Sequence, residues 1–156
     1  MKKIIYFLIF TFFLSIISLA DEKNIQVIDG DTIHIGKLKY RFFGIDAPET
    51  KQICEKDNIK IKCGVIAKNV LKNKIGDKIP ECIVKDKDRY QRLVAECFIG
   101  KESLSKFMVR EGYAVAYTQY SKDFIEDEKY AKKNKLGIWS MTFQIPSEYR
   151  KSLRNK

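Results

Sequence analysis

The chain has 156 residues and a formal net charge of +10, with 30 Lys and Arg against 20 Asp and Glu. This length suits one domain with a hydrophobic core, and the chain lacks the internal repeats and low-complexity tracts of solenoid and fibrous proteins. A strongly basic surface favours a polyanionic partner: nucleic acid, acidic polysaccharide or an anionic membrane. The charge alone does not choose among these partners.

The first twenty residues have the pattern of a signal peptide. Two lysines precede an uncharged apolar run from Ile4 to Ser18, and Ser18 and Ala20 are small residues at a cleavage site. The alternative is an uncleaved anchor, but the run is shorter than the roughly 20 apolar residues of a membrane-spanning helix. Cleavage leaves residues 21–156 with a charge of +8. We therefore predict an exported protein (secreted, periplasmic or at the cell surface) without stable membrane insertion.

Three short segments follow, rich in β-branched and aromatic residues: 25–28, 32–35 and 38–43. The turn signals Asp29-Gly30-Asp31 and Gly36-Lys37 separate them, so they are predicted to be consecutive antiparallel strands. Alternation along the third strand places Arg41 on the face opposite Phe42, away from the interior. His34 lies on a strand without a nucleophile motif and is interpreted as a structural or surface residue.

The rest of the chain predicts a polar loop, a hairpin and three helices. The loop spans residues 46–63, and the hairpin pairs 81–85 with 93–99. The helices are expected over 64–76, 102–111 and 122–135, the last two ended by Gly112 and Gly137, with Trp139 packing the third onto the body. The polar tail from Pro146 is expected to be frayed.

These elements predict one α+β domain over residues 21–156 that is mainly β. Five short strands with helices on one side favour a small five-stranded barrel of the oligonucleotide/oligosaccharide-binding (OB) type with three helices. No feature of the chain requires more than a monomer.

Four cysteines in an exported chain favour two disulfides. Cys82 and Cys97 are at similar distances from the hairpin connection and can face each other, which leaves Cys54 and Cys63 to close a polar loop. Zinc is the competing interpretation, but the chain has no Cys-x-x-Cys pair and one histidine.

Charged residues with complementary chemistry gather in two nearby segments, Asp29-Gly30-Asp31-Thr32 and Arg41 to Thr50. Asp31, Asp46 and Glu49 offer hard oxygen ligands for a divalent cation, and Arg41 offers a phosphate fork. A further guanidinium, Arg92, follows in Asp88-Arg89-Tyr90-Gln91-Arg92. Together these residues are suited to cleaving a phosphodiester.

The same segments resemble the staphylococcal nuclease (thermonuclease) family. The matching segments, in the same order as in the family, are 27–32, 41–50, 88–92, 104–112, 114–117 and 135–140. The resemblance implies an OB-type barrel with three helices and calcium-dependent cleavage of DNA and RNA.

Carried over by position, the resemblance implies a role for each charged residue. Asp31 and Asp46 are the calcium-ligand carboxylates, beside the main-chain carbonyl of Ala47. Arg41 and Arg92 bind phosphate, and Glu49 activates water. The resemblance also implies that Tyr117 contacts the nucleotide and that Asp29 lies near the metal.

Two positions depart from the family pattern. Gln91 stands where the family commonly has Gly, and because Gln resists positive φ, the turn that carries Arg92 is expected to be shaped differently. Ala47 replaces a Thr, which leaves a main-chain ligand unaffected.

Other interpretations stay open. One is a catalytically weak nucleic-acid- or protein-binding module on the same barrel, and another is a surface protein that binds acidic polymers by charge. Tyr117 also suits a core position. The lysines of the third helix either follow a substrate backbone or form a solvated helix face; they are Lys129, Lys132, Lys133 and Lys135.

Overall fold

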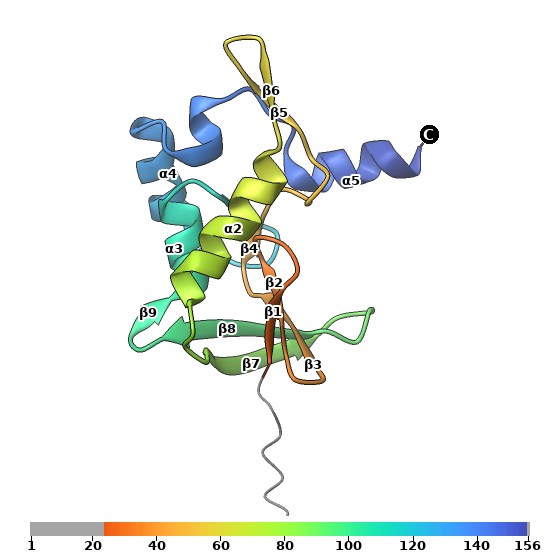
Figure 1. The fold of residues 1–156 in the computed structure, drawn as a ribbon, viewed down its shortest axis with the longest axis vertical. Coiled ribbons are helices and arrows are strands. Elements are labelled where there is room, and N and C mark those ends of the chain that lie inside the picture. Colours follow the sequence, from red (N-terminus) through yellow and green to blue (C-terminus); the bar gives the residue numbers. More distant parts are fainter. Residues whose placement is uncertain (1–23, 156) are drawn as a thin grey trace, which may run out of the picture.

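The computed structural model describes residues 24–155, so the predicted signal peptide lies outside the described residues. One twisted sheet dominates the fold (Figure 1), in the order β1-β2-β3-β8-β7, with β9 paired to β8. Its strands are β1 (Ile25–Val27), β2 (Thr32–Ile35), β3 (Leu38–Phe42), β7 (Glu81–Lys87), β8 (Leu93–Ile99) and β9 (Glu102–Ser103). β3 and β8 run parallel, and the other pairs are antiparallel.

Two small ladders accompany this sheet. β4 (Ile45–Asp46) pairs with β10 (Val115–Ala116), and β5 (Cys54–Lys56) pairs with β6 (Ile59–Ile61) as a hairpin at the top of Figure 1. The predicted mainly β, α+β class is confirmed. Among the described strands, however, the sheet is open rather than a closed barrel, because β1 and β7 are its two edges and β4 pairs with β10 instead of extending it.

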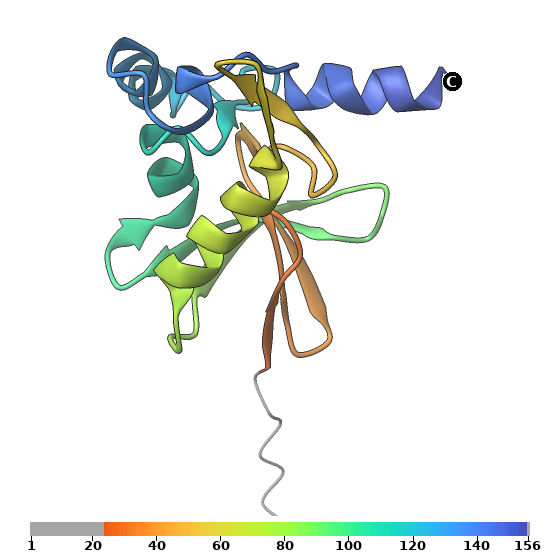
Figure 2. The ribbon, with the colours of Figure 1, turned by 45° about the horizontal axis from the view of Figure 1, so that its top comes forward.

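Four α-helices and one 3-10 helix complete the described part of the chain. They are α2 (Cys63–Ile75), α3 (Leu104–Arg110), α4 (Ile125–Lys133), η1 (Gly137–Ser140) and α5 (Pro146–Arg154). The first three α-helices are those predicted. The fourth, α5, forms where a frayed tail was expected, and Pro146 at its first turn suits a helix start. It extends away from the body in both ribbon views (Figures 1 and 2).

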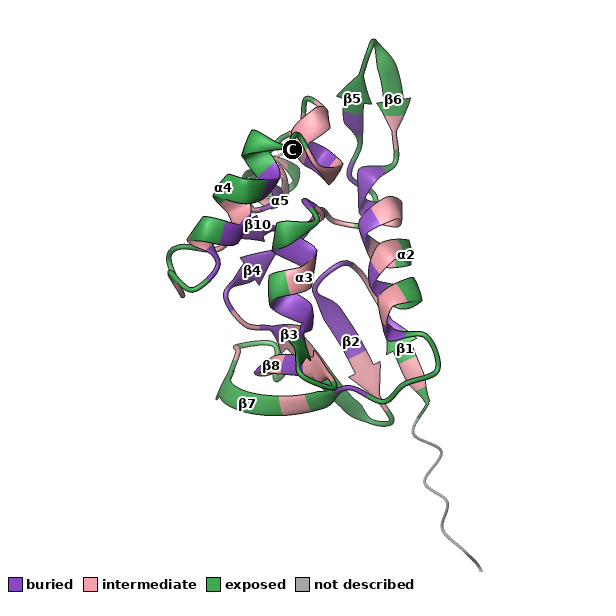
Figure 3. Ribbon diagram, turned by 90° about the vertical axis from the view of Figure 1, so that its left-hand side faces the viewer, coloured by how far each residue is buried: buried purple, intermediate pink, exposed green. Residues whose placement is uncertain are grey.

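The core lies between the main sheet and helices α2 and α3. Buried residues on α2 recur every four positions at Cys63, Ala67, Leu71 and Ile75, which makes one apolar stripe. Figure 3 shows this stripe facing the body, with buried residues also along β2 and exposed ones along β7.

Both predicted disulfides are present. Cys82 and Cys97 face each other directly in the β7–β8 ladder, and Cys54 at the start of β5 joins Cys63 at the start of α2. Within residues 24–155, every helix is too short or too polar to cross a membrane.

Candidate active site

Arg41 joins two buried aspartates. As the strand alternation predicts, it lies on the face opposite the buried Phe42, but its side chain is only 14% exposed. Its Nη1 pairs with Asp31 Oδ1, and its Nη2 donates to Asp46 Oδ1 at 2.8 Å. The guanidinium of Arg41 therefore bonds one oxygen of each aspartate and keeps the two carboxylates close together.

Short backbone elements fix the two aspartates. Asp31 ends the β1–β2 turn, where its N–H donates to Asp29 Oδ1 at 3.0 Å, and its carboxylate accepts the N–H of Ala47 at 2.7 Å. Asp46 lies on β4 opposite Val115 of β10. Both aspartates are almost fully buried, at 1% and 0% exposure.

The charges of this cluster support one another. Burial opposes ionisation of Asp31, but the charge of Arg41 and the hydrogen bonds from Asp29, Ala47 and Thr32 together outweigh it and lower the carboxyl pKa. Burial likewise opposes the charge of Arg41, and its two aspartate partners outweigh that effect and raise its pKa. Asp29 behaves differently: burial, and then the neighbouring Asp31, raise its pKa to about 8, so its carboxyl is largely protonated at neutral pH.

Glu49 reaches the cluster through Arg150 of α5. Arg150 Nη1 donates to Glu49 Oε1 at 2.9 Å and to Asp46 Oδ1 at 2.8 Å, and its Nη2 donates to Asp46 Oδ2 at 3.0 Å. Burial opposes the charge of Arg150, but its hydrogen bonds to Asp46 and then Glu49 outweigh it and raise its pKa.

A buried glutamine holds the main chain of Glu49. Gln52 is 0% exposed; its N–H donates to the Glu49 carbonyl at 2.7 Å, and its Oε1 accepts the Glu49 N–H at 3.3 Å. Its Nε2 donates to the carbonyl of Gln144 at 2.6 Å. Gln52 therefore ties the Glu49 loop to the segment that leads into α5.

Arg92 is oriented by the turn that precedes it. Asp88 accepts the backbone N–H of Arg92 at 2.9 Å and its Nε at 2.8 Å. Gln91 has φ of +64°, so this turn keeps the positive φ that a Gly would adopt readily. The differently shaped turn expected from Gln91 is therefore not observed at this dihedral.

Arg41 and Arg92 line one cavity of about 410 Å³. Its wall is aromatic as well as basic, with Tyr117 beside Tyr120 at a ring-centroid distance of 4.8 Å. The N–H of Tyr117 donates to Gly44 O at 2.8 Å, which places this tyrosine next to β4. Tyr117 is therefore a cavity residue and not part of the core.

The donor set suits a hard divalent cation. Asp31 and Asp46 offer carboxylate oxygens of the kind that calcium prefers, held together by one guanidinium, and the main chain of Ala47 adjoins them. In residues 24–155, however, no three His, Cys, Asp or Glu side chains are grouped as a ready-made metal cluster.

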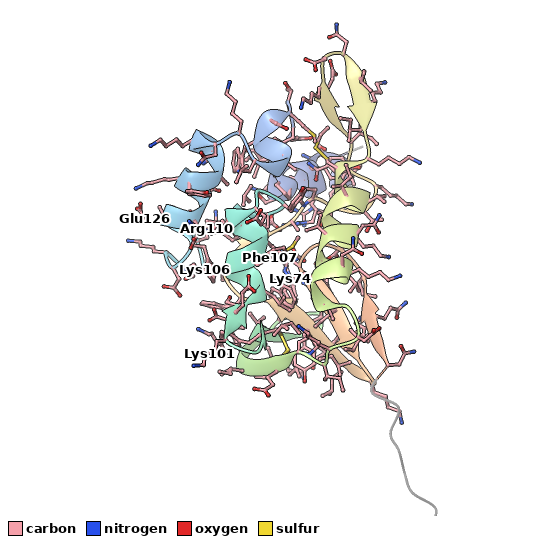
Figure 4. All side chains as sticks on the ribbon, turned by 60° about the vertical axis from the view of Figure 1, so that its left-hand side comes forward. Lys74, Lys101, Lys106, Phe107, Arg110 and Glu126 are labelled. Atoms are coloured by element: carbon pink, nitrogen blue, oxygen red, sulfur yellow. A yellow bond between two sulfur atoms is a disulfide. The ribbon has the colours of Figure 1, made fainter. Side chains whose placement is uncertain are left out.

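A second cavity, of about 530 Å³, shares no lining residue with the first. It lies along α3 (Figure 4), where the half-buried ring of Phe107 lies 4.4 Å from Lys74 Nζ of α2 and Arg110 faces α4. Two of its charged lining residues are paired within the protein: Glu102 with Lys74 at 2.6 Å, and Arg110 with Asp127 at 3.1 Å. The hydroxyl of Ser103, which also lines this cavity, accepts the N–H of Lys106 at 3.1 Å and caps α3.

The predicted basic helix is α4 with the residues that follow it. Lys129 pairs with Glu126 at 2.7 Å and Lys132 with Glu128 at 2.6 Å. Lys132 also lies 4.4 Å from the ring centroid of Trp139, in line with the predicted packing of that tryptophan. Two of the four lysines are therefore held by partners on their own helix.

Arg150 and Gln52 are the site residues that sequence reasoning missed. Glu49 and Asp46 lie 101 and 104 positions from Arg150, so no local pattern connects them. The signal available in the sequence was the Pro146 start with basic residues in the last turn, which is typical of a helix.

The chain matches the model of the staphylococcal nuclease homologues over residues 39–141. It is 30% identical to an "Uncharacterized endonuclease" of Haemophilus influenzae, over 96% of this chain and 86% of the relative. It is 34% identical to the Thermonuclease of Staphylococcus hyicus, over 76% of this chain and 75% of the relative. An "Uncharacterized endonuclease" of Escherichia coli O157:H7 is 29% identical, over 78% of each chain.

Proposed function

Because the chain belongs to the family of staphylococcal nuclease homologues, we propose that it is an exported, calcium-dependent nuclease that hydrolyses phosphodiester bonds of DNA and RNA. One observation carries this proposal. Two buried aspartates share Arg41, and Arg41 lines the same aromatic cavity as Arg92. Arg41 thus connects the two carboxylates to the cavity that Arg92 also lines, which supports the proposal.

In this proposal Arg41 and Arg92 bind the scissile phosphate. A guanidinium donates two parallel hydrogen bonds to phosphate oxygens and stabilises their charge as it rises in the transition state. Asp88 fixes the orientation of Arg92, so little reorganisation is needed when substrate binds. Tyr117 and Tyr120 offer faces on which a base can stack.

Glu49 is proposed to accept the proton of the attacking water. Asp31 and Asp46, with the carbonyl of Ala47, would hold the calcium ion. Asp29 would not bind the ion but accepts the backbone N–H of Asp31 and so helps to fix its position. When bound, the ion supplies Lewis-acid stabilisation to the phosphate. The neighbouring Arg41 helps to lower the pKa of Asp31, which favours the ionised form that cation binding requires.

The paired disulfides support export, because such bonds persist in oxidising compartments. The alternative is a binding module of the same family with little activity. Because Gln91 leaves positive φ in place, the presentation of Arg92 gives no support to that alternative.

A cleavage assay tests the proposal. The mature chain is incubated with plasmid DNA, single-stranded DNA and RNA, first with calcium and then with a chelator. Calcium-dependent cutting of DNA and RNA is expected. Binding without cutting would favour the binding module, and cutting that survives the chelator would overturn the role of the ion.

Arg92→Ala is the sharper variant for this assay. Loss of a phosphate donor typically costs 10²–10³ in kcat, and Arg92 is a partly exposed surface group, so the fold should survive. Arg41→Ala is harder to interpret because it removes the guanidinium that Asp31 and Asp46 share and leaves both aspartates buried. Such a loss destabilises a protein by about 3–5 kcal/mol. Circular dichroism separates the two effects.

A further inference from the structure

The C-terminal segment and the Glu49 loop are joined at several places. Thr142 and Glu55 exchange two backbone hydrogen bonds of 2.8 Å, and Gln52 reaches the carbonyl of Gln144. Nearer the site, Tyr149 Oη donates to the carbonyl of Lys51 at 3.4 Å. These contacts form a continuous seam beside the loop that carries Glu49, and α5 extends outward from the end of the seam (Figure 2).

Arg150 lies at the site end of this seam. The same nitrogen, Nη1, bonds one oxygen of Asp46 and one oxygen of Glu49, so these two oxygens are neighbours. The other nitrogen, Nη2, bonds the remaining oxygen of Asp46. The guanidinium therefore directs its three hydrogen bonds at the carboxylates, and none reaches the cavity lined by Arg41 and Arg92.

We propose that Arg150 is a positioning residue of this nuclease, which holds the carboxylate of Glu49 against Asp46 so that the water-activating group has a fixed orientation. The proposal rests on the proposed function in one respect, because it takes Glu49 as the proton acceptor. Its structural content, the fixing of Glu49 and Asp46 by α5, is independent of the reaction.

The geometry favours positioning over two other roles. Arg41 and Arg92, the arginines proposed to bind phosphate, line the aromatic cavity, whereas Arg150 does not line it and bonds Asp46 and Glu49. A purely structural ion pair would need only one carboxylate, whereas Arg150 joins a residue of β4 to a residue of the adjacent loop. Residues that hydrogen-bond to a metal ligand without touching the metal typically change metal affinity or activity 10–100-fold when they are replaced.

Kinetics on Arg150→Ala, Arg150→Lys and the control Lys151→Ala give the first test. We expect Arg150→Ala to lower kcat about 10–100-fold with KM changed less than about threefold. Arg150→Lys keeps a point charge but loses the planar fork, so it should recover part of kcat. Lys151 is an exposed neighbour on the same helix, and its variant should match the wild type.

Two measurements do not depend on cleavage. Hydrogen exchange of the amides in residues 47–53 should speed up in Arg150→Ala and stay unchanged in Lys151→Ala. Titration with calcium alone should show an affinity that is equal or weaker in Arg150→Ala. Circular dichroism verifies that each variant is folded, and Arg150→Lys replaces Arg150→Ala if the latter is not.

The outcomes separate the two proposals. A wild-type chain that does not cut any nucleic acid defeats the proposed function, while the exchange and calcium measurements still decide whether α5 fixes Glu49. Unchanged or raised kcat, a rise in KM alone, unaltered exchange, or tighter calcium binding in Arg150→Ala would each overturn the positioning role. Tighter binding would make Arg150 a competitor of the cation.

Discussion

Gln91 holds a backbone conformation that usually belongs to glycine. Its φ of +64° lies in the left-handed region, which costs a residue with a side chain about 1–2 kcal/mol. Its N–H donates to the carbonyl of Asp88 at 2.9 Å, inside the same turn that presents Arg92. The turn therefore keeps its shape under local strain.

Replacing Gln91 with Gly should relieve that strain. The gain is partly offset by the greater freedom of Gly in the unfolded chain, so we expect the free energy of unfolding to rise by about 0.5–1 kcal/mol. Urea denaturation measures it. Arg89→Gly, in the same turn but without positive φ, should lose stability, and equal losses in both variants would contradict the strain.

Asp88 connects turn geometry to pH. Burial alone would raise its carboxyl pKa, but hydrogen bonds from Arg92 and then Tyr90 outweigh it and hold the pKa below the ordinary 3.8. For a carboxyl with a lowered folded-state pKa, the stabilisation is present above the unfolded value and is lost as the pH falls through the folded value.

Asp88→Asn should therefore be less stable than the wild type at pH 7, by about 1–2 kcal/mol, and should also turn over more slowly because Arg92 loses its orienting partner. At a pH well below 3.8 the stability difference should narrow, since the wild-type carboxyl gains a proton as the pH falls through its lowered folded-state pKa. Urea unfolding at both pH values measures the difference. A stability difference that grows at acidic pH would contradict the lowered pKa of Asp88.

At the scale of the elements, the start of helix α2 packs against the backbone of the Glu49 loop so closely that only glycine fits at position 64. A Cβ added at Gly64 would lie 1.7 Å from the carbonyl oxygen of Glu49. Gly64 also lies in the first turn of α2, next to Cys63, whose disulfide to Cys54 closes the same loop. The helix start and the disulfide together fix the course of the loop.

Gly64→Ala should displace this loop. In an unconstrained helix the change would add up to about 1 kcal/mol of stability, so a loss of about 1–3 kcal/mol has the opposite sign and is diagnostic. Turnover should fall together with stability because the carbonyl that must move belongs to Glu49. Lys72→Ala, on the exposed side of α2, is the control. Thermal unfolding with unchanged or raised Tm for Gly64→Ala would be inconsistent with this contact.

The two disulfides should differ in their effect on activity. Each closes a short loop, 9 and 15 residues apart in sequence, and chain entropy assigns roughly 3 kcal/mol to either. Replacing Cys54 and Cys63 by Ser should lower kcat more than replacing Cys82 and Cys97, because only the first pair closes the Glu49 loop. Paired stability and rate measurements test this difference, and equal kinetic losses at equal stability would contradict it.

At the scale of the whole molecule, basic charge governs binding of a polyanion. If three phosphates of single-stranded DNA are contacted, log K should fall against log salt with a slope of about −2. Lys106→Ala, in the second cavity, should leave this slope unchanged, whereas Arg92→Ala should reduce it. Fluorescence anisotropy in calcium-free buffer measures it. A slope that responds to Lys106 instead would move the binding surface to α3.

Local sequence signals predicted much of this architecture. Turn residues and strand alternation gave β2 and β3, and the hairpin register placed Cys82 opposite Cys97. The open sheet was not predictable in the same way, because parallel pairing of β3 with β8 joins segments about fifty residues apart and leaves no periodic trace. The role of Arg150 was not predicted for the same reason, because its partners Asp46 and Glu49 are distant in sequence. Its helix is also mostly polar, so no apolar stripe in the sequence predicted it.

The family match ends at residue 141, five positions before α5 begins. A recombinant chain that ends at residue 141 would keep Asp31, Arg41, Asp46 and Arg92, yet would omit Arg150, the residue proposed to position Glu49. The choice of C-terminal boundary during cloning therefore decides whether Glu49 and Asp46 keep the guanidinium that joins them.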